Sequence, residues 1–191
     1  MISTPHRFSV KDYYRMGEAG LFPPGKRVEL LDGEIKDMMP IGPFHSGVVN
    51  RLLNFFAAIS NGRWLVTAQN PVRLGNYSEP EPDVVLVNPS ADDYTLHHPR
   101  PEDVLLLVEV ADTSLDYDEG QKLAAYGNAG IEEYRVVNLK DQCVQVYREP
   151  HYAGYARTTV LKPGDKASPA AFPDVQVDVA ALLHRPEKGA A

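Results

Sequence analysis

Two short apolar runs each carry a carboxylate at a position where a buried strand rarely has one. Asp83 opens the run 83–87, and Glu109 lies near the end of the run 104–110. The two residues are 26 positions apart (109 − 83 = 26), which is enough for one strand, a connection and a return to a neighbouring strand. On adjacent strands the two carboxylates would share one face and repel each other, and a bound cation would remove that cost.

The ligand types predict which cation this would be. Hard oxygen ligands, with no cysteine or clustered histidine beside them, favour magnesium or manganese over zinc. The backbone carbonyl of Val110 is expected to be a further ligand if the backbone turns outward at that position. The predicted metal ligands are therefore Asp83, Glu109 and Val110, the last through its main chain.

Lys122 follows Glu109 by 13 residues (122 − 109 = 13), on a predicted helix 116–128 whose first turns return to the same end of the sheet. A lysine there would orient an attacking water or stabilise charge on a pentavalent phosphorus. Glu29, on a predicted hairpin, and His45, near the start of a helix, would complete the rim. A helix N-terminus near a metal suits a substrate phosphate, so His45 is the candidate for substrate binding.

Each candidate also has a purely structural interpretation. Lys122 would pair with Asp118 on a solvated helix face. Glu109 would bond a buried partner, and Asp83 would cap a turn. Glu29 would be an exposed strand residue, and a lone histidine is more often structural than functional. It is less common for all of these structural interpretations to hold together than for any one to hold alone. A Glu inside an apolar seven-residue strand, for example, is rare without a partner.

Other potential ligands are less favourable. The pair His97-His98 has no third ligand spaced to join it. Glu79 and Glu81 precede the first carboxylate strand among prolines, which excludes them as ligands. The single cysteine, Cys143, excludes an internal disulfide and a cysteine-based metal site, and its alternating surroundings place it in a strand.

Composition limits the class of protein. A chain of 191 residues predicts one domain, 1–191. With 26 acidic and 19 basic residues the net charge is −7, which argues against a general nucleic-acid-coating protein. It leaves room for an enzyme that acts on phosphates through a metal, because the ion supplies the local positive charge. No stretch approaches the ~18 apolar residues of a membrane span, and no signal peptide is evident, so a cytoplasmic protein with no membrane partner is expected.

Hydrophobic periodicity predicts an α/β domain. Ser9 caps a helix 8–16, with Asp12 as its short capping box. The pair Asp32-Gly33 predicts a tight hairpin, because a type I′ turn needs positive φ at both central residues. Strand 104–110, helix 116–128 and strand 134–138 would form a right-handed crossover. The other expected elements are a helix that starts at 44–46 and stops at 61–62, strands 64–68, 72–74, 83–87, 143–147 and 155–161, a terminal segment 179–183 and a frayed tail 185–191.

Five segments, taken in order, resemble the PD-(D/E)xK superfamily, which has the restriction-endonuclease-like fold. More closely, they resemble the large bacterial family labelled "putative restriction endonucleases", whose physiological role is unsettled. Each segment alone is a weak indication of the family, but the five segments in this order are specific for it. The resemblance covers about residues 8–183. The segments are Arg27–Glu34, Glu81–Val84, Val108–Val110, Tyr117–Tyr126 and Ala129–Tyr134.

The resemblance implies an α/β fold with a mixed central β-sheet flanked by helices, an N-terminal helix and a β-hairpin. It also implies that Asp83 and Glu109 ligate magnesium, that Lys122 is the catalytic lysine and that Glu29 is an additional acidic residue.

The chain departs from the resembled patterns at two positions. Many members of the bacterial family have tryptophan where this chain has Arg135, a residue expected to pack in a strand outside the site. The second departure concerns the lysine of the superfamily. The usual lysine stands two residues after the acid, where this chain has Ala111, and the family resembled moves that lysine to the next helix.

These observations predict a metal-dependent endonuclease that hydrolyses phosphodiester bonds of nucleic acid, with DNA as the expected substrate. Cutting two strands would favour a symmetric homodimer. The alternative is a non-catalytic binding or assembly module on the same fold with a vestigial metal site, which the acidic charge slightly favours. A carboxylate-pair glycosidase ranks below both, because the sole tryptophan, Trp64, lies in a predicted core strand rather than in a sugar-binding cleft.

Overall fold

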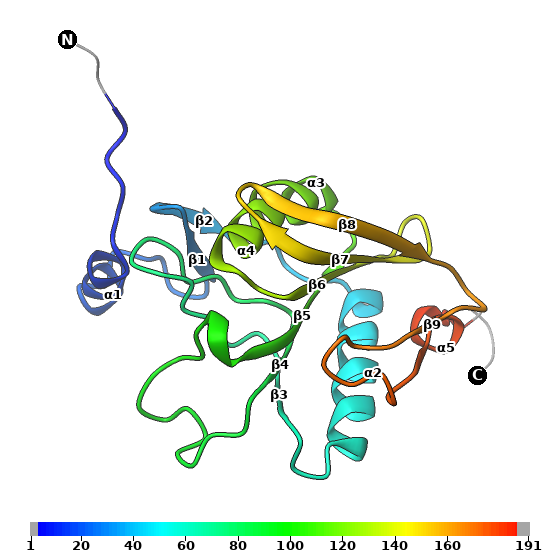
Figure 1. Ribbon diagram of the computed structural model, residues 1–191. Coiled ribbons are helices and arrows are strands. Elements are labelled where there is room, and N and C mark those ends of the chain that lie inside the picture. The colour runs from blue at the N-terminus through cyan, green and yellow to red at the C-terminus, as the bar shows by residue number, and fades with distance from the viewer. Residues whose placement is uncertain (1–3, 187–191) are drawn as a thin grey trace.

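A six-stranded sheet forms the centre of the computed structural model, which describes residues 4–186 (Figure 1). The strand order is β3-β4-β5-β6-β7-β8, with β5 and β6 parallel and all other neighbours antiparallel. This mixed sheet confirms the predicted fold class. Residues 187–191 of the expected tail lie outside the described residues. The strands of the sheet are β3 (Leu65–Thr67), β4 (Val84–Val87), β5 (Val104–Ala111), β6 (Glu133–Asn138), β7 (Cys143–His151) and β8 (Gly154–Leu161).

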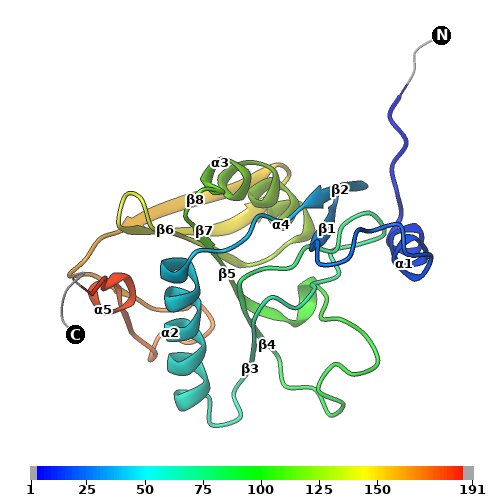
Figure 2. The same ribbon diagram turned by 180° about the vertical axis from the view of Figure 1, so that it is seen from behind.

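Helices cover both faces of the sheet, and two small hairpin-like pairs lie beside it. Figures 1 and 2 show α2 and α4 on opposite faces. The pair β1–β2 and the pair β9–β10 are antiparallel and separate from the main sheet. The helices are α1 (Val10–Glu18), α2 (Pro43–Ile59), α3 (Leu115–Tyr117), α4 (Leu123–Ala129) and α5 (Val179–Leu183). The remaining strands are β1 (Val28–Leu31), β2 (Glu34–Asp37), β9 (Lys166–Ala167) and β10 (Val177–Asp178).

Local sequence signals determine the N-terminal part of the fold. Ser9 caps α1 and forms the predicted capping box with Asp12. Asp32 (φ 52°) and Gly33 (φ 80°) form the tight turn between β1 and β2, as the Asp-Gly pair predicts. Gly33 is also required sterically, because a Cβ there would lie 2.6 Å from the Cβ of Arg7. The predicted N-terminal helix and hairpin are therefore confirmed.

The central strand β5 contributes to two hydrophobic cores in alternation. Val108 and Val110 pack in the core that α2 covers. Leu107 and Ala111 pack in the second core, to which α4 contributes. Because side chains alternate along a strand, Glu109 lies on the face of this second core. The prediction that this strand is buried on both faces is confirmed, and a carboxylate is thereby placed beside α4.

One predicted strand is wrong. Residues 72–74 belong to no strand, and their amides bond to a neighbouring loop segment instead. Val72 donates to the carbonyl of Pro80 (2.9 Å) and Leu74 donates to the carbonyl of Ser78 (3.0 Å). Pro80 has no N–H with which to return a ladder bond, so regular pairing does not develop.

The predicted helix 116–128 exists, but it is divided into three parts. Between α3 and α4 lies a π-helical turn, Asp118–Lys122. Gly130, with φ 79°, ends α4 in the left-handed conformation. Helical periodicity in the sequence does not distinguish i→i+4 from i→i+5 bonding over so few residues. Such π turns are frequent at functional sites, and this one ends at Lys122.

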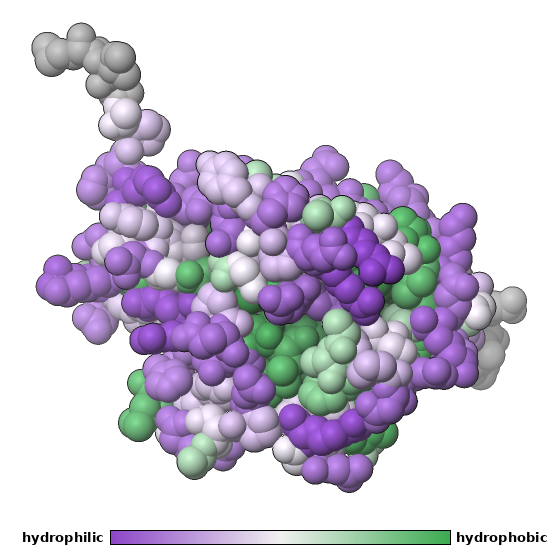
Figure 3. Space-filling view, in the orientation of Figure 1, coloured by the Kyte–Doolittle hydropathy of each residue, from purple (hydrophilic) through white to green (hydrophobic). Residues whose placement is uncertain are grey.

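The surface is mostly hydrophilic in the view of Figure 3, with one apolar hollow near its centre, where Figure 1 draws β4 and β5. Within residues 4–186, the helices are too short or too polar to cross a membrane.

We predict that Gly127→Ala destabilises the fold. Gly127 lies where α4 crosses β8, and a Cβ there would stand 2.2 Å from the carbonyl oxygen of Gly154. Relieving this clash requires the helix or the strand to move, at a cost of about 1–3 kcal/mol or more in the free energy of unfolding. Urea unfolding monitored by circular dichroism measures this change in the free energy of unfolding.

Gly47→Ala is the matched control. Gly47 lies inside α2, where an added Cβ meets no atom within 4 Å. This substitution is expected to be neutral or to stabilise by up to about 1 kcal/mol, because alanine favours the helix over glycine. Equal stability of the two variants would contradict the close packing of α4 on β8.

Candidate functional site

A cleft of about 590 Å³ contains all the side chains that the sequence singles out. One wall is formed by residues 36–42, which leave β2 and lead into α2, and the other by residues 112–118 after β5. The hairpin β1–β2 lies near α4 in Figure 1, and its residues Glu29, Lys36 and Asp37 line the cleft. The cleft is lined by Glu29, His45, Asp83, Glu109 and Lys122 among others.

Strand register brings Asp83 and Glu109 together. In the antiparallel pair β4–β5, Val84 lies opposite Val108. Continuing this register by one residue places Asp83 opposite Glu109, so the two carboxylates share a face. The amide of Asp83 lies 3.3 Å from Glu109 Oε2, and the amide of Val110 donates to Asp83 Oδ2 (2.8 Å).

Lys122 is buried and binds carboxylates from two different elements. Its Nζ lies 2.9 Å from Glu109 Oε1 on β5 and 3.3 Å from Glu29 Oε1 on β1. Only 4% of the residue is exposed, so the interpretation of Lys122 as a solvated partner of Asp118 is wrong. The interpretation that Glu109 has a buried partner is correct, since Tyr126 also donates its hydroxyl to Glu109 Oε1 (2.8 Å).

Glu29 is buried rather than exposed on its hairpin. The exposed-strand interpretation is wrong, because the residue is 2% exposed. Its Oε1 accepts the hydroxyl of Tyr117 (3.1 Å) in addition to lying beside Lys122, and its Oε2 accepts the amide of Glu81 (2.9 Å). Glu81 lines the cleft but pairs its own carboxylate with Arg27 (2.6 Å). Both carboxylate oxygens of Glu29 thus have partners, and these contacts hold the hairpin against Lys122 and Tyr117.

Sequence reasoning missed the two tyrosines that bond the carboxylates. In the sequence, Tyr117 and Tyr126 stand out only as the two ends of a segment that carries the family resemblance. Tyr126 stands four residues after Lys122, on the same helix face. A buried tyrosine hydroxyl needs a hydrogen-bond partner, so a tyrosine at that spacing from a candidate lysine was the available signal.

The electrostatics of the cluster hold Lys122 in its charged form. Burial alone would lower the pKa of Lys122, but Glu109, Glu29 and Asp118 together raise it above its ordinary value. Burial raises the pKa of Glu109 well above its ordinary value, although the ammonium of Lys122 opposes that shift. Burial likewise raises the pKa of Asp118 to about 6. A lysine that stays protonated can stabilise negative charge but cannot act as a general base.

His45 is directed at a carboxylate. Its Nε2 lies 3.0 Å from Asp83 Oδ2, and the ring is buried in the first turn of α2. Its Nδ1 has no hydrogen-bond partner. With the amide of Val110 also on Oδ2, this arrangement fixes the rotation of the Asp83 carboxyl group and leaves Oδ1 with only a 3.5 Å contact from Gln69.

The donor set fits a magnesium-type ion held partly by water. Among residues 4–186, no three His, Cys, Asp or Glu side chains form a ready metal-binding group. Asp83 and Glu109 supply two carboxylates, and Val110 supplies a carbonyl on the edge of β5 where its amide already meets Asp83. Continued register places Val110 opposite Pro82, which has no N–H to bond that carbonyl. Magnesium commonly keeps several waters and takes only one or two carboxylates, so this set is sufficient.

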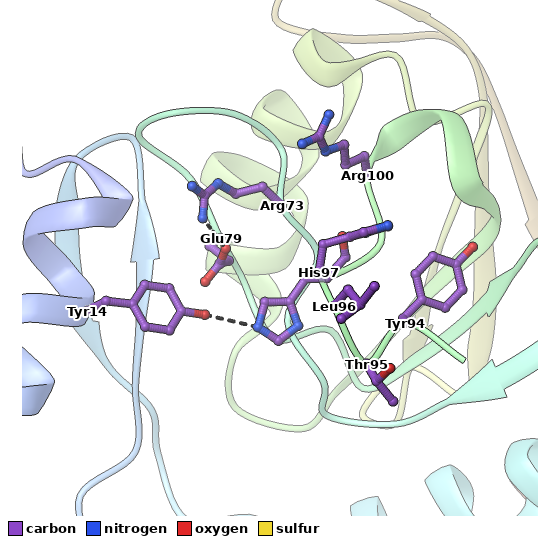
Figure 4. Close-up of a pocket in the computed structure, with 9 residues that line it drawn as sticks. Tyr14, Arg73, Glu79, Tyr94, Thr95, Leu96, His97 and Arg100 are labelled. Atoms are coloured by element: carbon purple, nitrogen blue, oxygen red, sulfur yellow. Dashed lines mark hydrogen bonds and ion pairs between the residues drawn. The ribbon is translucent and has the colours of Figure 1, made fainter. Parts of the chain in front are cut away.

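A second pocket, of about 380 Å³, lies between α1 and residues 94–100 (Figure 4). Tyr14 bonds His98 Nε2 (3.0 Å), and Arg73 pairs with the buried Glu79 (2.7 Å). His97 Nδ1 lies 3.1 Å from the carbonyl of His98. The two histidines therefore have protein partners rather than a shared third ligand. Glu79 faces this pocket and not the cleft, in agreement with its exclusion as a metal ligand.

Comparison with known proteins agrees with this fold. The model of a family described as "Uma2: Putative restriction endonuclease" matches residues 10–180. Among solved structures, the chain is similar to a crystal structure described as a "putative nuclease" from Anabaena variabilis, with a TM-score of 0.68 at 14% sequence identity. The likeness covers 92% of this chain and 97% of that chain, and at this identity it shows the fold alone. No curated protein matches the chain.

We predict that Lys122→Met destabilises the protein strongly and in a pH-dependent way. The substitution leaves Glu109 and Glu29 buried without their cation, at a cost of about 3–5 kcal/mol. Removing the ammonium removes the charge that opposes the effect of burial on Glu109, so the pKa of Glu109 rises further and protonation at low pH then neutralises that carboxyl group. The loss of unfolding free energy should therefore be larger at about pH 8 than at about pH 5, as measured by urea unfolding.

Lys36→Met is the control for this experiment. Lys36 lines the same cleft, but its partner Glu34 is exposed. Its removal should change the free energy of unfolding by no more than about 0.5 kcal/mol at either pH. If Lys122→Met behaved like Lys36→Met, the buried ion cluster would not be the constraint that the geometry indicates.

Proposed function

We propose that this chain, which belongs to the family described as "Putative restriction endonuclease", hydrolyses phosphodiester bonds of nucleic acid, with DNA as its substrate and magnesium or manganese as its cofactor. One observation carries the proposal. Asp83, Glu109 and Lys122 come from three different elements and meet at the floor of one cleft. Charged side chains buried in this way are costly, and a catalytic site is the setting in which such a cost is commonly retained.

Each residue has a role that follows from its contacts. Asp83, Glu109 and the carbonyl of Val110 would hold the ion, which when bound supplies Lewis acidity and lowers the pKa of its water. Lys122, kept protonated by its two carboxylates, places positive charge beside the position of a scissile phosphate, where negative charge develops. Glu29 fixes that ammonium from β1.

His45 has a positioning role in this scheme rather than the direct substrate contact expected from its place on a helix N-terminus. The ring is buried against Asp83, and its one bonded nitrogen is directed at the carboxylate. A partner of this kind orients a metal ligand, and such partners commonly affect metal affinity by about 10–100-fold.

The acidity of the cleft favours the rival function, a non-catalytic binding or assembly module. Seven acidic residues line the cleft against two lysines. Without cations such a surface repels a polyanion, so nucleic acid would depend on bound metal to approach it. A symmetric homodimer is compatible with either function. The glycosidase alternative has no support, because Trp64 is buried in the core.

We predict metal-dependent cleavage that Asp83→Asn abolishes. Supercoiled plasmid, linear DNA and RNA are incubated with the protein and magnesium, manganese or a chelator, and the products are separated on gels. Replacing one carboxylate oxygen by an amide keeps the shape of the side chain but removes the charge that binds the ion. The rate should fall by at least about 100-fold, more than is typical for the partners of a ligand.

Asp37→Asn is the control, because Asp37 lies at the exposed rim of the same cleft and pairs with Lys26. It should retain cleavage close to the wild-type rate. Absence of cleavage with either metal on all three substrates, in a protein that is folded, would overturn the proposed activity.

Binding of the metal is predicted separately from cleavage. Magnesium should raise the melting temperature of the wild-type protein, because an ion that binds only the folded state stabilises it by about 2.7 kcal/mol at 100 times its Kd. Glu109→Gln should lose this increase, while Glu102→Gln, on the 3₁₀ turn before β5, should keep it. The rival module with a vestigial site would show no magnesium-dependent increase in either protein.

A further inference from the structure

An apolar segment forms one wall of the cleft. Residues 38–42, which we call the apolar rim, connect β2 to α2, and Figure 2 shows this connection passing α4. Its side chains include Met38, Met39, Pro40 and Ile41. Met39 is 75% exposed and Ile41 is 46% exposed. Single exposed apolar residues are ordinary, but these two stand in one short segment on the cleft that carries the charged cluster.

The cationic side chains of the cleft are too few to hold an intact duplex by its phosphates. Of the two lysines that line it, Lys122 is buried between carboxylates and Lys36 pairs with Glu34. Proteins that bind duplex through its backbone make about 6–10 phosphate contacts, each of which releases counterions. Apart from the proposed metal, affinity in this cleft would therefore come mainly from contacts to something other than phosphate.

The size and the chemistry of the cleft favour a nucleobase as that other contact. A volume of about 590 Å³ is that of a pocket for a compact ligand, not of a channel for a duplex. Methionine, isoleucine and proline are the side-chain types that proteins insert between bases to unstack them. Tyr117, on the opposite wall, adds an aromatic ring whose hydroxyl is already bonded to Glu29.

We propose that Met39 and Ile41 pack against an unstacked base, so that the substrate of this cleft is nucleic acid that is single-stranded or unpaired at the cleavage position. The inference rests on the proposed function, because it takes the charged floor of the cleft as the place of the scissile phosphate. A base removed from its stack gains apolar contact with the rim, and a base that is already unpaired has least to lose on entering.

Binding of labelled oligonucleotides tests the proposal without requiring cleavage. Fluorescence anisotropy compares a single strand, its intact duplex and the same duplex with one central bulged nucleotide, with calcium replacing magnesium. The wild-type protein should bind the single strand and the bulge at least about 10-fold more tightly than the duplex, with a log K versus log [salt] slope no steeper than about −2. The double variant Met39→Ser/Ile41→Ser should lose this preference.

Leu96→Ser is the matched control, since Leu96 is 85% exposed but lines the second pocket. It should leave the preference unchanged. Equal or tighter binding of intact duplex, or a preference that survives in the double variant, would overturn the proposal. So would loss of a wild-type dimer in the double variant by sedimentation, because the rim would then be an interface between two copies of the chain.

Failure of this inference is distinguishable from failure of the proposed activity. Metal-dependent cleavage of duplex and single strand at equal rates, unaffected by the double variant, leaves the nuclease and removes the role of the rim. A single-strand preference that the double variant loses, in a protein that cleaves with neither metal, supports the base contact and removes the nuclease.

Discussion

The buried ammonium of Lys122, held between Glu109 and Glu29, is the interaction on which the site depends. It joins the end of the π-helical turn to β5 and to the hairpin strand β1, three parts of the chain that otherwise share few contacts. Burying one cation among several carboxylates is favourable only because each charge removes the desolvation cost of another. The proposed metal ion would neutralise the negative charge that is left over around Asp83 and Glu109.

A missing hydrogen bond leaves the carbonyl of Val110 free for the proposed cation. Pro80 and Pro82 cannot donate to the sheet, so β4 begins only at Val84, and β5 continues past it with an unpaired edge. The amide of Val110 on this edge is satisfied by Asp83 rather than by a neighbouring strand. Because the ladder ends before Val110, the amide of Val110 is free to orient the carboxylate of Asp83. His45 contacts the same carboxylate oxygen.

The cleft combines a charged floor with an apolar rim. Two residues at the floor, Glu29 and His45, lie shortly before and shortly after the rim in the sequence. Residues 38–42 connect the hairpin that carries Glu29 to the helix that carries His45. A change in the path of residues 38–42 would therefore affect the placement of both the hairpin and the helix. This arrangement connects the chemistry proposed for the floor of the cleft to the type of nucleic acid proposed for its rim.

The sequence by itself determined the parts that depend on short-range regularities: the capped helix at Ser9, the Asp32-Gly33 turn and the apolar strands that carry or follow Glu109 and Asp83. These follow from capping, turn geometry and the two-residue period of a strand. Only the tertiary structure decided that Lys122 and Glu29 are buried against each other, that Tyr117 and Tyr126 bond the carboxylates, that His45 meets Asp83, and that residues 72–74 form no strand. Burial and charge pairing depend on distances between segments remote in sequence, and no local pattern encodes those distances.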